Sequence, residues 1–372
     1  MTHHPAKPLS RAHMPTGYDI SYAAYSNGRS VRIPENFGPQ QDLPGFEPTY
    51  HNIVDYIVRI THRIWEAREV EYIAKTYAAD CKVFDDFGLQ SDNATIISNT
   101  HGTVSAFPDI ILPADEVIWA GDPQSGFHTS HRLSLQGTNT GPTPYGQATG
   151  RRMDTLCIAN CVVKENEIFS EHVLYNTTAL LADLGYDAWA EAERLAREPM
   201  PGWPRDAATW TALRNEARPD TPICKQDPIA GFDPDKFTRD LHHALWQCGD
   251  MSVLDSAHGD AVSFHGTSHR RAQDRKSYAV MVAQLRDSLS DITFQVDEVY
   301  WMGNDAEGYL LSTRWSMDAH HTNDGHFGAP SDAELQIWGI TQCRVKDGRV
   351  QEEWMLINEL DVMIQIAKAR MT

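Results

Sequence analysis

The chain alternates between segments with a helical hydrophobic period and segments with the period of a strand. Between 51 and 79, apolar residues such as Ile53, Ile57 and Ile60 recur every three or four positions, which predicts helix. Apolar and polar residues then alternate, which predicts strands at 115–121, 127–137, 153–163 and 167–176. The pattern returns with a helix from about Asp235 and strands at 294–302, 308–318, 334–346 and 349–358. Helices followed by antiparallel strands predict the α+β class.

The second half of the chain repeats the first at an offset of 182 residues. Identical residues match across the predicted strands: Trp119 and Trp301, Arg132 and Arg314, Cys161 and Cys343, Glu171 and Glu353, Asn176 and Asn358. A repeat of this length indicates two copies of one folding unit. We therefore expect two tandem α+β barrels in one chain.

Composition shifts suggest where the copies begin and end. We expect an extended N-terminal arm at 1–48, a first domain at 49–186, a helical linker at 187–231 and a second domain at 232–372. Two copies in one chain are able to pair their sheets as a pseudo-dimer, and a homodimer of the whole chain is a second arrangement.

Composition excludes several partners. The chain has 372 residues and a formal net charge of −19, which disfavours binding to nucleic acid or to an anionic membrane. No stretch approaches the roughly 20 apolar residues of a membrane helix, and the N-terminal segment lacks the apolar core of a secretory signal. The six cysteines form no CxxC pair, so a cytoplasmic protein with free thiols is expected.

Several short motifs resemble one known family. Phe-Pro-Asp-Ile stands at 107–110, Gly-Asp at 121–122, and Arg132 leads into Gly-Thr-Asn-Thr-Gly at 137–141. With the closing Glu171 and Asn176, each copy resembles the SnoaL-like polyketide cyclase family of the nuclear-transport-factor-2-like fold. The resemblance implies a cone, formed by a curved sheet around helices, with one apolar cavity per copy. It also implies acid–base chemistry on a small molecule, without metal or organic cofactor.

The closing residues of both copies depart from the family pattern. The family has an acid–base Asp where this chain has Asn176 and Asn358. An amide does not carry a proton near pH 7, although it donates hydrogen bonds to an oxyanion. Either another residue has taken over the proton transfer, or the cavities bind without catalysis.

The candidates for that role in copy one lie on two predicted strands. Alternation puts His172 and Asn176 on one face, and the resemblance implies that this face looks into the cavity. We expect His172 to move a proton while Arg132 and Asn176 stabilise negative charge. The alternatives are a core histidine and, for Arg132, a salt bridge across the sheet. His128 shares the face of Arg132 and is expected to contact substrate.

Copy two offers a different polar set. Arg314, Trp354, Asn358 and His320 are expected to bind substrate there. A denser cluster consists of Asp318, His320, His321, Asp324 and His326. It is interpreted as a polar loop at the cavity mouth, with acid–base catalysis by His321 or metal binding as alternatives.

Three functions remain open from these residues. The preferred one is a cofactor-independent acid–base enzyme that isomerises, cyclises, dehydrates or hydrolyses a small oxygenated molecule. The second is a binding or scaffold protein that has lost its carboxylate. The third is a metal-dependent hydrolase or lyase built on the cluster in copy two.

Overall fold

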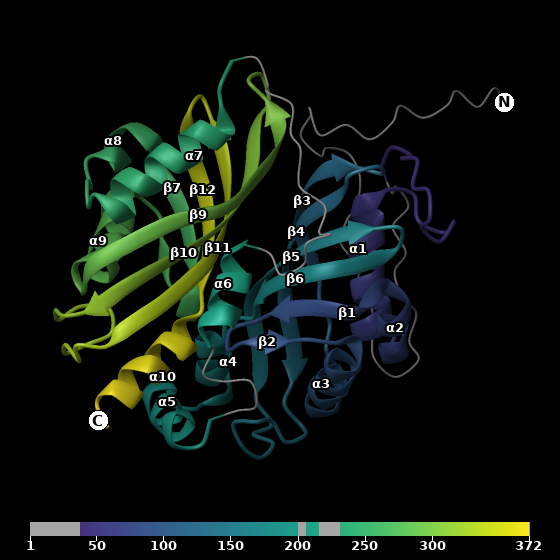
Figure 1. The fold of residues 1–372 in the computed structure, drawn as a ribbon, viewed down its shortest axis with the longest axis horizontal. Coiled ribbons are helices and arrows are strands. Elements are labelled where there is room, and N and C mark those ends of the chain that lie inside the picture. Colours follow the sequence, from purple (N-terminus) through teal and green to yellow (C-terminus); the bar gives the residue numbers. More distant parts are fainter. Residues whose placement is uncertain (1–37, 200–205, 216–230, 372) are drawn as a thin grey trace. The chain divides into compact units, whose positions relative to one another are not determined.

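The computed structural model describes residues 38–199, 206–215 and 231–371, and these form two compact units (Figure 1). Within that part, the first unit holds 38–84 and 89–173, and the second holds 85–88, 174–215 and 231–371. Among the helices in these ranges, none combines the length and apolar character that crossing a membrane requires.

The first unit wraps helices on one six-stranded sheet. Its helical elements are α1 (Ile53–Thr61), the π-helical turn η1 (His62–Glu66), η2 (Val70–Tyr72), α2 (Ile73–Thr76) and α3 (Asn93–Ala106). Its strands are β1 (Tyr77–Phe84), β2 (Leu89–Gln90), β3 (Ala114–Asp122), β4 (Gly126–Thr138), β5 (Arg152–Lys164) and β6 (Glu167–Leu174). The strand order is β2-β1-β6-β5-β4-β3, with β1 parallel to β6. The helical pattern predicted over 51–79 is therefore interrupted, and its last residues begin a strand.

The second unit repeats this sheet strand for strand. Its strands are β7 (His258–Gly266), β8 (Arg271–Ala272), β9 (Leu289–Asn304), β10 (Gly308–His321), β11 (Glu334–Lys346) and β12 (Arg349–Ile357), in the order β8-β7-β12-β11-β10-β9. Its helical elements are α4 (Thr177–Leu184), α5 (Ala188–Arg197), α6 (Ala207–Asn215), α7 (Pro234–His242), η3 (His243–Gln247), α8 (Val253–Ala257), η4 (Thr267–His269), α9 (Arg275–Asp287) and α10 (Glu359–Ala369). The predicted α+β class and the tandem repeat are confirmed.

The units divide the chain at a different point from the sequence-based boundary. The sequence assigns 174–186 to the first domain, whereas the structure groups them with the second unit. The reason is packing, because α4 and α5 lie against α10 (Figure 1). The described part of the expected linker at 187–231 also belongs to the second unit, and of the expected arm at 1–48 only 38–48 lies within the described residues.

One face of each sheet packs on helices, and we call it the inner face. In the second unit, Trp246 of η3 stacks on Trp315 of β10 with ring centroids 6.0 Å apart. In the first unit, Phe127 of β4 meets Phe46, which in turn meets Tyr56 of α1 at 4.9 Å. Successive strand residues point to opposite faces, so these contacts, followed through the strand pairing, assign the residues between the bulges to the inner or the outer face.

A tight glycine turn recurs at the same place in both sheets. Gly121 and Gly303 have φ of 94° and 110°, and a Cβ on either would lie 2.1 Å from the carbonyl oxygen of Gly126 or Gly308. We expect Gly121→Ala to reduce the free energy of unfolding by about 2 kcal/mol, because both the backbone and the contact resist a side chain.

Gly102 supplies the matched control for urea denaturation. It lies within α3, and a Cβ there meets nothing within 4 Å. Gly102→Ala is expected to raise stability by roughly 0.5–1 kcal/mol, since Ala favours helix. Equal effects of the two substitutions would contradict the strain at the turn.

Candidate functional site

Three residue types, Trp, Cys and Glu, occur at matching positions across the inner face of both sheets. In the second unit, Trp301 pairs with Leu311, Leu311 with Cys343, and Cys343 with Glu353. The first unit has Trp119, Thr129, Cys161 and Glu171 at the matching positions. Trp, Cys and Glu are therefore identical in the two copies and point toward the covering helices.

The glutamate of the second unit is buried beside a tyrosine and a histidine. Glu353 is 5% exposed, and its Oε1 accepts a hydrogen bond of 2.8 Å from the hydroxyl of Tyr278 on α9. Its Oε2 lies 3.5 Å from Nε2 of His258 on β7. Burial, reinforced by the charge of Glu353, raises the pKa of Tyr278 well above its usual value. Tyr278 therefore stays protonated and donates to the carboxylate.

The first unit keeps the glutamate and a tyrosine. The Tyr77 hydroxyl donates a hydrogen bond of 3.0 Å to Glu171, which is 8% exposed. Burial, and after it the charge of Glu171, raises the pKa of the Cys161 thiol well above its usual value, which leaves Cys161 uncharged. Each inner face thus carries one buried carboxyl group held by a phenol.

The candidates predicted from the sequence of copy one lie on the outer face. His172 follows Glu171 and stacks on Phe84 with ring centroids 4.7 Å apart. Arg132 is buried opposite Glu116 of β3, and His128 is buried opposite Ala120. The expectation that the face of His172 looks into the cone is therefore wrong. Alternation had separated the two faces correctly, but the packing helices select the other one.

The two closing asparagines bind backbone groups. Asn176 precedes α4 with φ of 55°, and its Oδ1 accepts a hydrogen bond of 2.8 Å from the Ser268 amide. Asn358 precedes α10, and its Oδ1 accepts from the Trp338 amide at 3.0 Å. Its Nδ2 donates to Asp361 at 2.7 Å. Both amides therefore tie helix starts to the rest of the second unit.

Arg314 and Trp354 also have local partners within the second unit. Arg314 is 1% exposed, donates a hydrogen bond of 2.5 Å to the Leu213 carbonyl at the end of α6, and lies 3.5 Å from Asp297. Burial raises the pKa of Asp297 to about 6, although Arg314 opposes the shift. A salt bridge of the kind considered as the alternative for Arg132 is therefore present at the matching Arg314 of copy two. Trp354 is half-buried on the outer face and stacks on His265 at 5.7 Å.

The cluster predicted in copy two is divided between different environments. His321 is buried, with Nδ1 3.0 Å from the Ser331 hydroxyl, and burial lowers its pKa. His326 binds Glu359 at 2.7 Å, and Asp324 is exposed. Within the described ranges, no group of three or more His, Cys, Asp or Glu side chains is arranged to hold a metal ion. The metal alternative therefore lacks a converging donor set.

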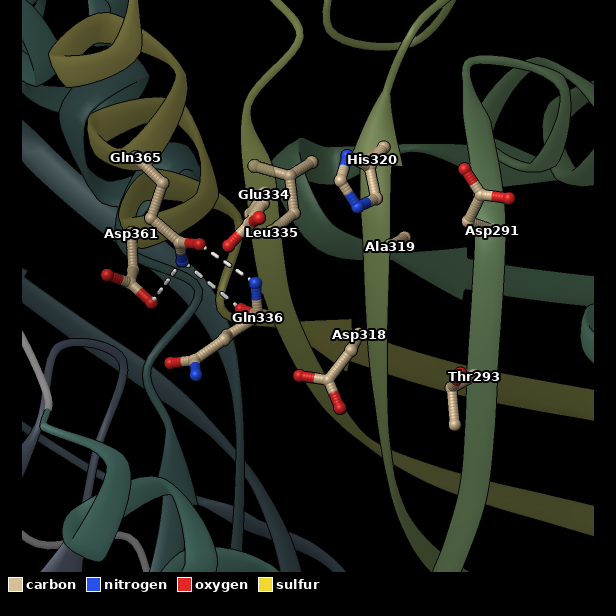
Figure 2. A pocket seen from close by; sticks show the side chains of 10 residues that line it. All are labelled: Asp291, Thr293, Asp318, Ala319, His320, Glu334, Leu335, Gln336, Asp361 and Gln365. Carbon is tan, nitrogen blue, oxygen red and sulfur yellow. Dashed lines mark hydrogen bonds between the residues drawn. The ribbon is translucent and has the colours of Figure 1, made fainter.

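The two remaining members of the cluster line a polar cavity of about 500 Å³ on the outer side of the second sheet. Figure 2 shows Asp318 and His320 along β10, flanked by Asp291 and Thr293 of β9. Other lining residues are Glu334 and Gln336 of β11 and Asp361 and Gln365 of α10. Asp318 is already paired with Arg214 at 2.7 Å. This cavity is polar and acidic, unlike the apolar cavity expected from the resemblance.

His131 is a buried group of the inner face that the sequence analysis did not single out. It is 2% exposed, its Nε2 has no hydrogen-bond partner among the described residues, and burial lowers its pKa to about 3. The pKa of His131 is lower in the folded protein than in the unfolded chain. The contribution of neutral His131 to the free energy of unfolding is therefore complete above about pH 6.5 and decreases as the pH is lowered.

We therefore expect His131→Leu to be less sensitive to acid than the wild type. Between pH 7 and pH 5, the stability of the variant relative to the wild type should rise by about 2 kcal/mol, because only the wild type loses stability by protonation of the unfolded chain. Urea denaturation at both pH values measures this. An unchanged difference would show that His131 is not held neutral.

Each unit is thus an α+β fold with a buried glutamate on the inner face of its six-stranded sheet. Residues 237–366 match the family model described as SnoaL-like polyketide cyclase. The sheet of the first copy has the same strand order as the sheet of the matched region.

Solved structures resemble parts of the chain at low identity. A putative polyketide cyclase from Acidithiobacillus ferrooxidans is 17% identical, covering 37% of this chain and 95% of its own, with a TM-score of 0.31. IdmH, a putative polyketide cyclase from Streptomyces antibioticus, is 19% identical, covering 36% and 99%, with a TM-score of 0.31. AclR, a putative hydroxylase from Streptomyces galilaeus, is 18% identical, covering 36% and 83%, with a TM-score of 0.31. A comparison with curated proteins gives no match.

Proposed function

We propose that the protein is a cofactor-independent acid–base enzyme that acts on a small oxygenated organic molecule at the inner face of a cone. The reaction belongs to the group of isomerisation, cyclisation, elimination of water or hydrolysis. In this proposal the proton is moved by the inner glutamate, Glu353 in copy two or Glu171 in copy one. The family match supports small-molecule chemistry of this kind.

One observation carries the proposal. Each cone buries a glutamate whose hydrogen-bonding tyrosine is neutral, at 2.8 Å for Glu353 and 3.0 Å for Glu171. A buried carboxyl group is costly to hold in its charged form, and buried titratable groups concentrate at functional sites. A carboxylate in that setting is able to accept a proton from a substrate, while the phenol orients it. The inner glutamates thus supply the group that Asn176 and Asn358 lack.

Substrate access requires movement of the covering helices. Glu353 is 5% exposed, and Tyr278, which reaches it from α9, is 2% exposed. The Phe264 ring lies 5.1 Å from the Tyr278 ring and offers an apolar contact to an organic ring.

Two alternatives to proton transfer by the inner glutamates are tested by the same experiment. A binding protein without turnover is favoured by the structural hydrogen bonds of both closing asparagines. Proton transfer by His172 with Arg132, as expected from the sequence, would instead use the outer face of the first sheet.

Untargeted mass spectrometry of a metabolite extract incubated with the protein tests the proposal. The wild type is compared with a Glu171→Gln, Glu353→Gln double variant and a His172→Ala, Arg132→Ala double variant. We expect one metabolite to be consumed by the wild type and by the second variant, with a mass change of zero or about 18 Da, the mass of the water lost or gained in such proton-transfer chemistry. Turnover by the glutamate variant alone would favour the outer face, and co-purification of a compound without turnover would favour binding.

A further inference from the structure

The two copies hold the inner glutamate with tyrosines from different elements. In copy one, Tyr77 is the first residue of β1 and pairs with Ile168. In copy two, the first residue of β7 is His258, which pairs with Val350, the residue matching Ile168. His258 therefore occupies the strand position that carries the glutamate-binding tyrosine in copy one.

The helix over the sheet shows the reverse exchange. Tyr278 follows Asp274, the residue that caps α9, by four positions, and Ile96 follows Asp92, the cap of α3, by the same number. Ile96 is buried and apolar, whereas Tyr278 carries the hydroxyl that binds the glutamate. In copy two the hydroxyl has moved from the strand to the helix, and an imidazole stands in its former place.

The two ring nitrogens of His258 are available to form hydrogen bonds with a bound molecule. The side chain is 0% exposed, its Nε2 is 3.5 Å from Oε2 of Glu353, and its ring lies 4.9 Å from the Tyr278 ring. Neither ring nitrogen makes a hydrogen bond within the described ranges. The His258 carbonyl accepts hydrogen bonds of 3.2 Å and 3.3 Å from Arg275 and Arg349, which hold this end of the strand. A buried imidazole without hydrogen bonds is unfavourable unless a bound molecule supplies them.

Three further titratable side chains that interact with the pair are neutral, whereas the cations of Arg275 and Arg349 bind the His258 carbonyl. His242 of α7 interacts with both Glu353 and His258, and burial lowers its pKa to about 4. Burial raises the pKa of the Cys343 thiol on β11, and Glu353 adds to the shift. Tyr278 of α9 stays protonated for the same two reasons. Glu353 is therefore the carboxyl group that pairs with the His258 imidazole, at 3.5 Å.

We propose that His258 is the second proton-transfer group of the site, and that it makes copy two the copy that turns substrate over. The proposal rests on the function proposed above and narrows its substrate to a hydroxy carbonyl compound. Glu353 removes a proton from the carbon beside the carbonyl, and the C–H electron pair forms the C=C bond. The C–O bond breaks as protonated His258 gives its proton to the hydroxyl, which leaves as water. The proton on Glu353 then passes to His258, which restores both groups.

Nuclear magnetic resonance of protein labelled with ¹⁵N-histidine tests the coupling without any substrate. The His258 signal is identified by its loss in a His258→Tyr variant, which copies the natural residue of copy one and so protects the fold. We expect Glu353→Gln to lower the proton affinity of His258 at least tenfold, one pH unit in the titration midpoint, because the carboxylate stabilises the imidazolium. A difference between the midpoints of the wild type and Glu353→Gln smaller than about 0.3 pH unit, roughly the resolving power of such titrations, would overturn the proposal.

A measurement of activity distinguishes a failure of this proposal from a failure of the proposed function on which it rests. His258→Tyr combined with Tyr278→Ile gives copy two the residue set of copy one, and turnover is expected to fall at least 100-fold, the roughly lower limit for loss of a proton-transfer group. If the wild type turns over no metabolite, the proposed function fails. If the wild type is active and this variant matches it, only the assignment of His258 is wrong.

Discussion

Glu353→Gln is expected to lower kcat by roughly 100- to 10,000-fold on the metabolite that the wild type consumes, which is the range attributed to one positioned acid or base. Glutamine keeps the size of the side chain and accepts the hydrogen bond from Tyr278, but it does not take up a proton. KM should change much less than kcat, because the shape of the inner face is retained. Steady-state kinetics with the purified variant measure both constants.

The neighbouring residue provides a control of the same chemistry. Glu352 lies on the outer face of β12, where it is 3.2 Å from Arg344 and half-exposed. Glu352→Gln should leave kcat within about twofold of the wild type, since an exposed pair of this kind contributes little. Similar losses in the two variants would indicate a general effect of charge or folding, and an active Glu353→Gln protein would rule out proton transfer by this carboxyl group.

The second large effect is expected from Glu359→Gln, which should reduce the stability of the second unit by about 3 kcal/mol. Glu359 is 3% exposed and accepts hydrogen bonds of 2.7 Å from both Thr178 and His326 and of 2.5 Å from Arg270. It also accepts one from Ser268. Losing its charge leaves the Arg270 cation without its counter-charge. Urea denaturation of the wild type and the variant at pH 7 gives the difference.

The pKa of Glu359 determines how the stability of the second unit changes at acid pH. Burial opposes ionisation of Glu359, but the His326 hydrogen bond and the Arg270 charge hold its pKa at about 2. This value is below that of the unfolded chain, so the stabilisation is present above about pH 4.5 and is lost toward pH 2. The difference between the wild type and Glu359→Gln should therefore shrink below pH 4.5. A constant difference would assign the effect to packing, and exposed Glu334→Gln serves as the neutral control.

The repeat is the part of this protein that could be predicted most securely from residues alone. Apolar periodicity depends only on local geometry, so it located both groups of strands before any contact was known. The identical pairs, among them Trp119 with Trp301 and Glu171 with Glu353, established that one fold occurs twice. They were also the signal for the shared Trp, Cys and Glu of the inner face, because identical residues on one strand face in two diverged copies indicate a shared constraint.

Apolar periodicity does not indicate which of the two faces of a strand packs against the helices. Alternation separates His172 from Glu171 but does not say which of them faces the helices. That choice depends on long-range packing, such as Trp246 of η3 on Trp315 of β10. The exchange of Tyr77 for His258, with Tyr278 supplied from a helix, is equally invisible without the fold, since the partners are distant in sequence.

The sequence by itself therefore determined the class, the tandem repeat and the absence of a proton-carrying side chain at Asn176 and Asn358, because these follow from local periodicity and residue chemistry. Only the tertiary structure decided that the glutamates face inward, that the asparagines tie helices in place, and that the polar cluster of copy two is divided among separate environments. Contacts between residues far apart in the chain make these decisions, and no local pattern encodes them.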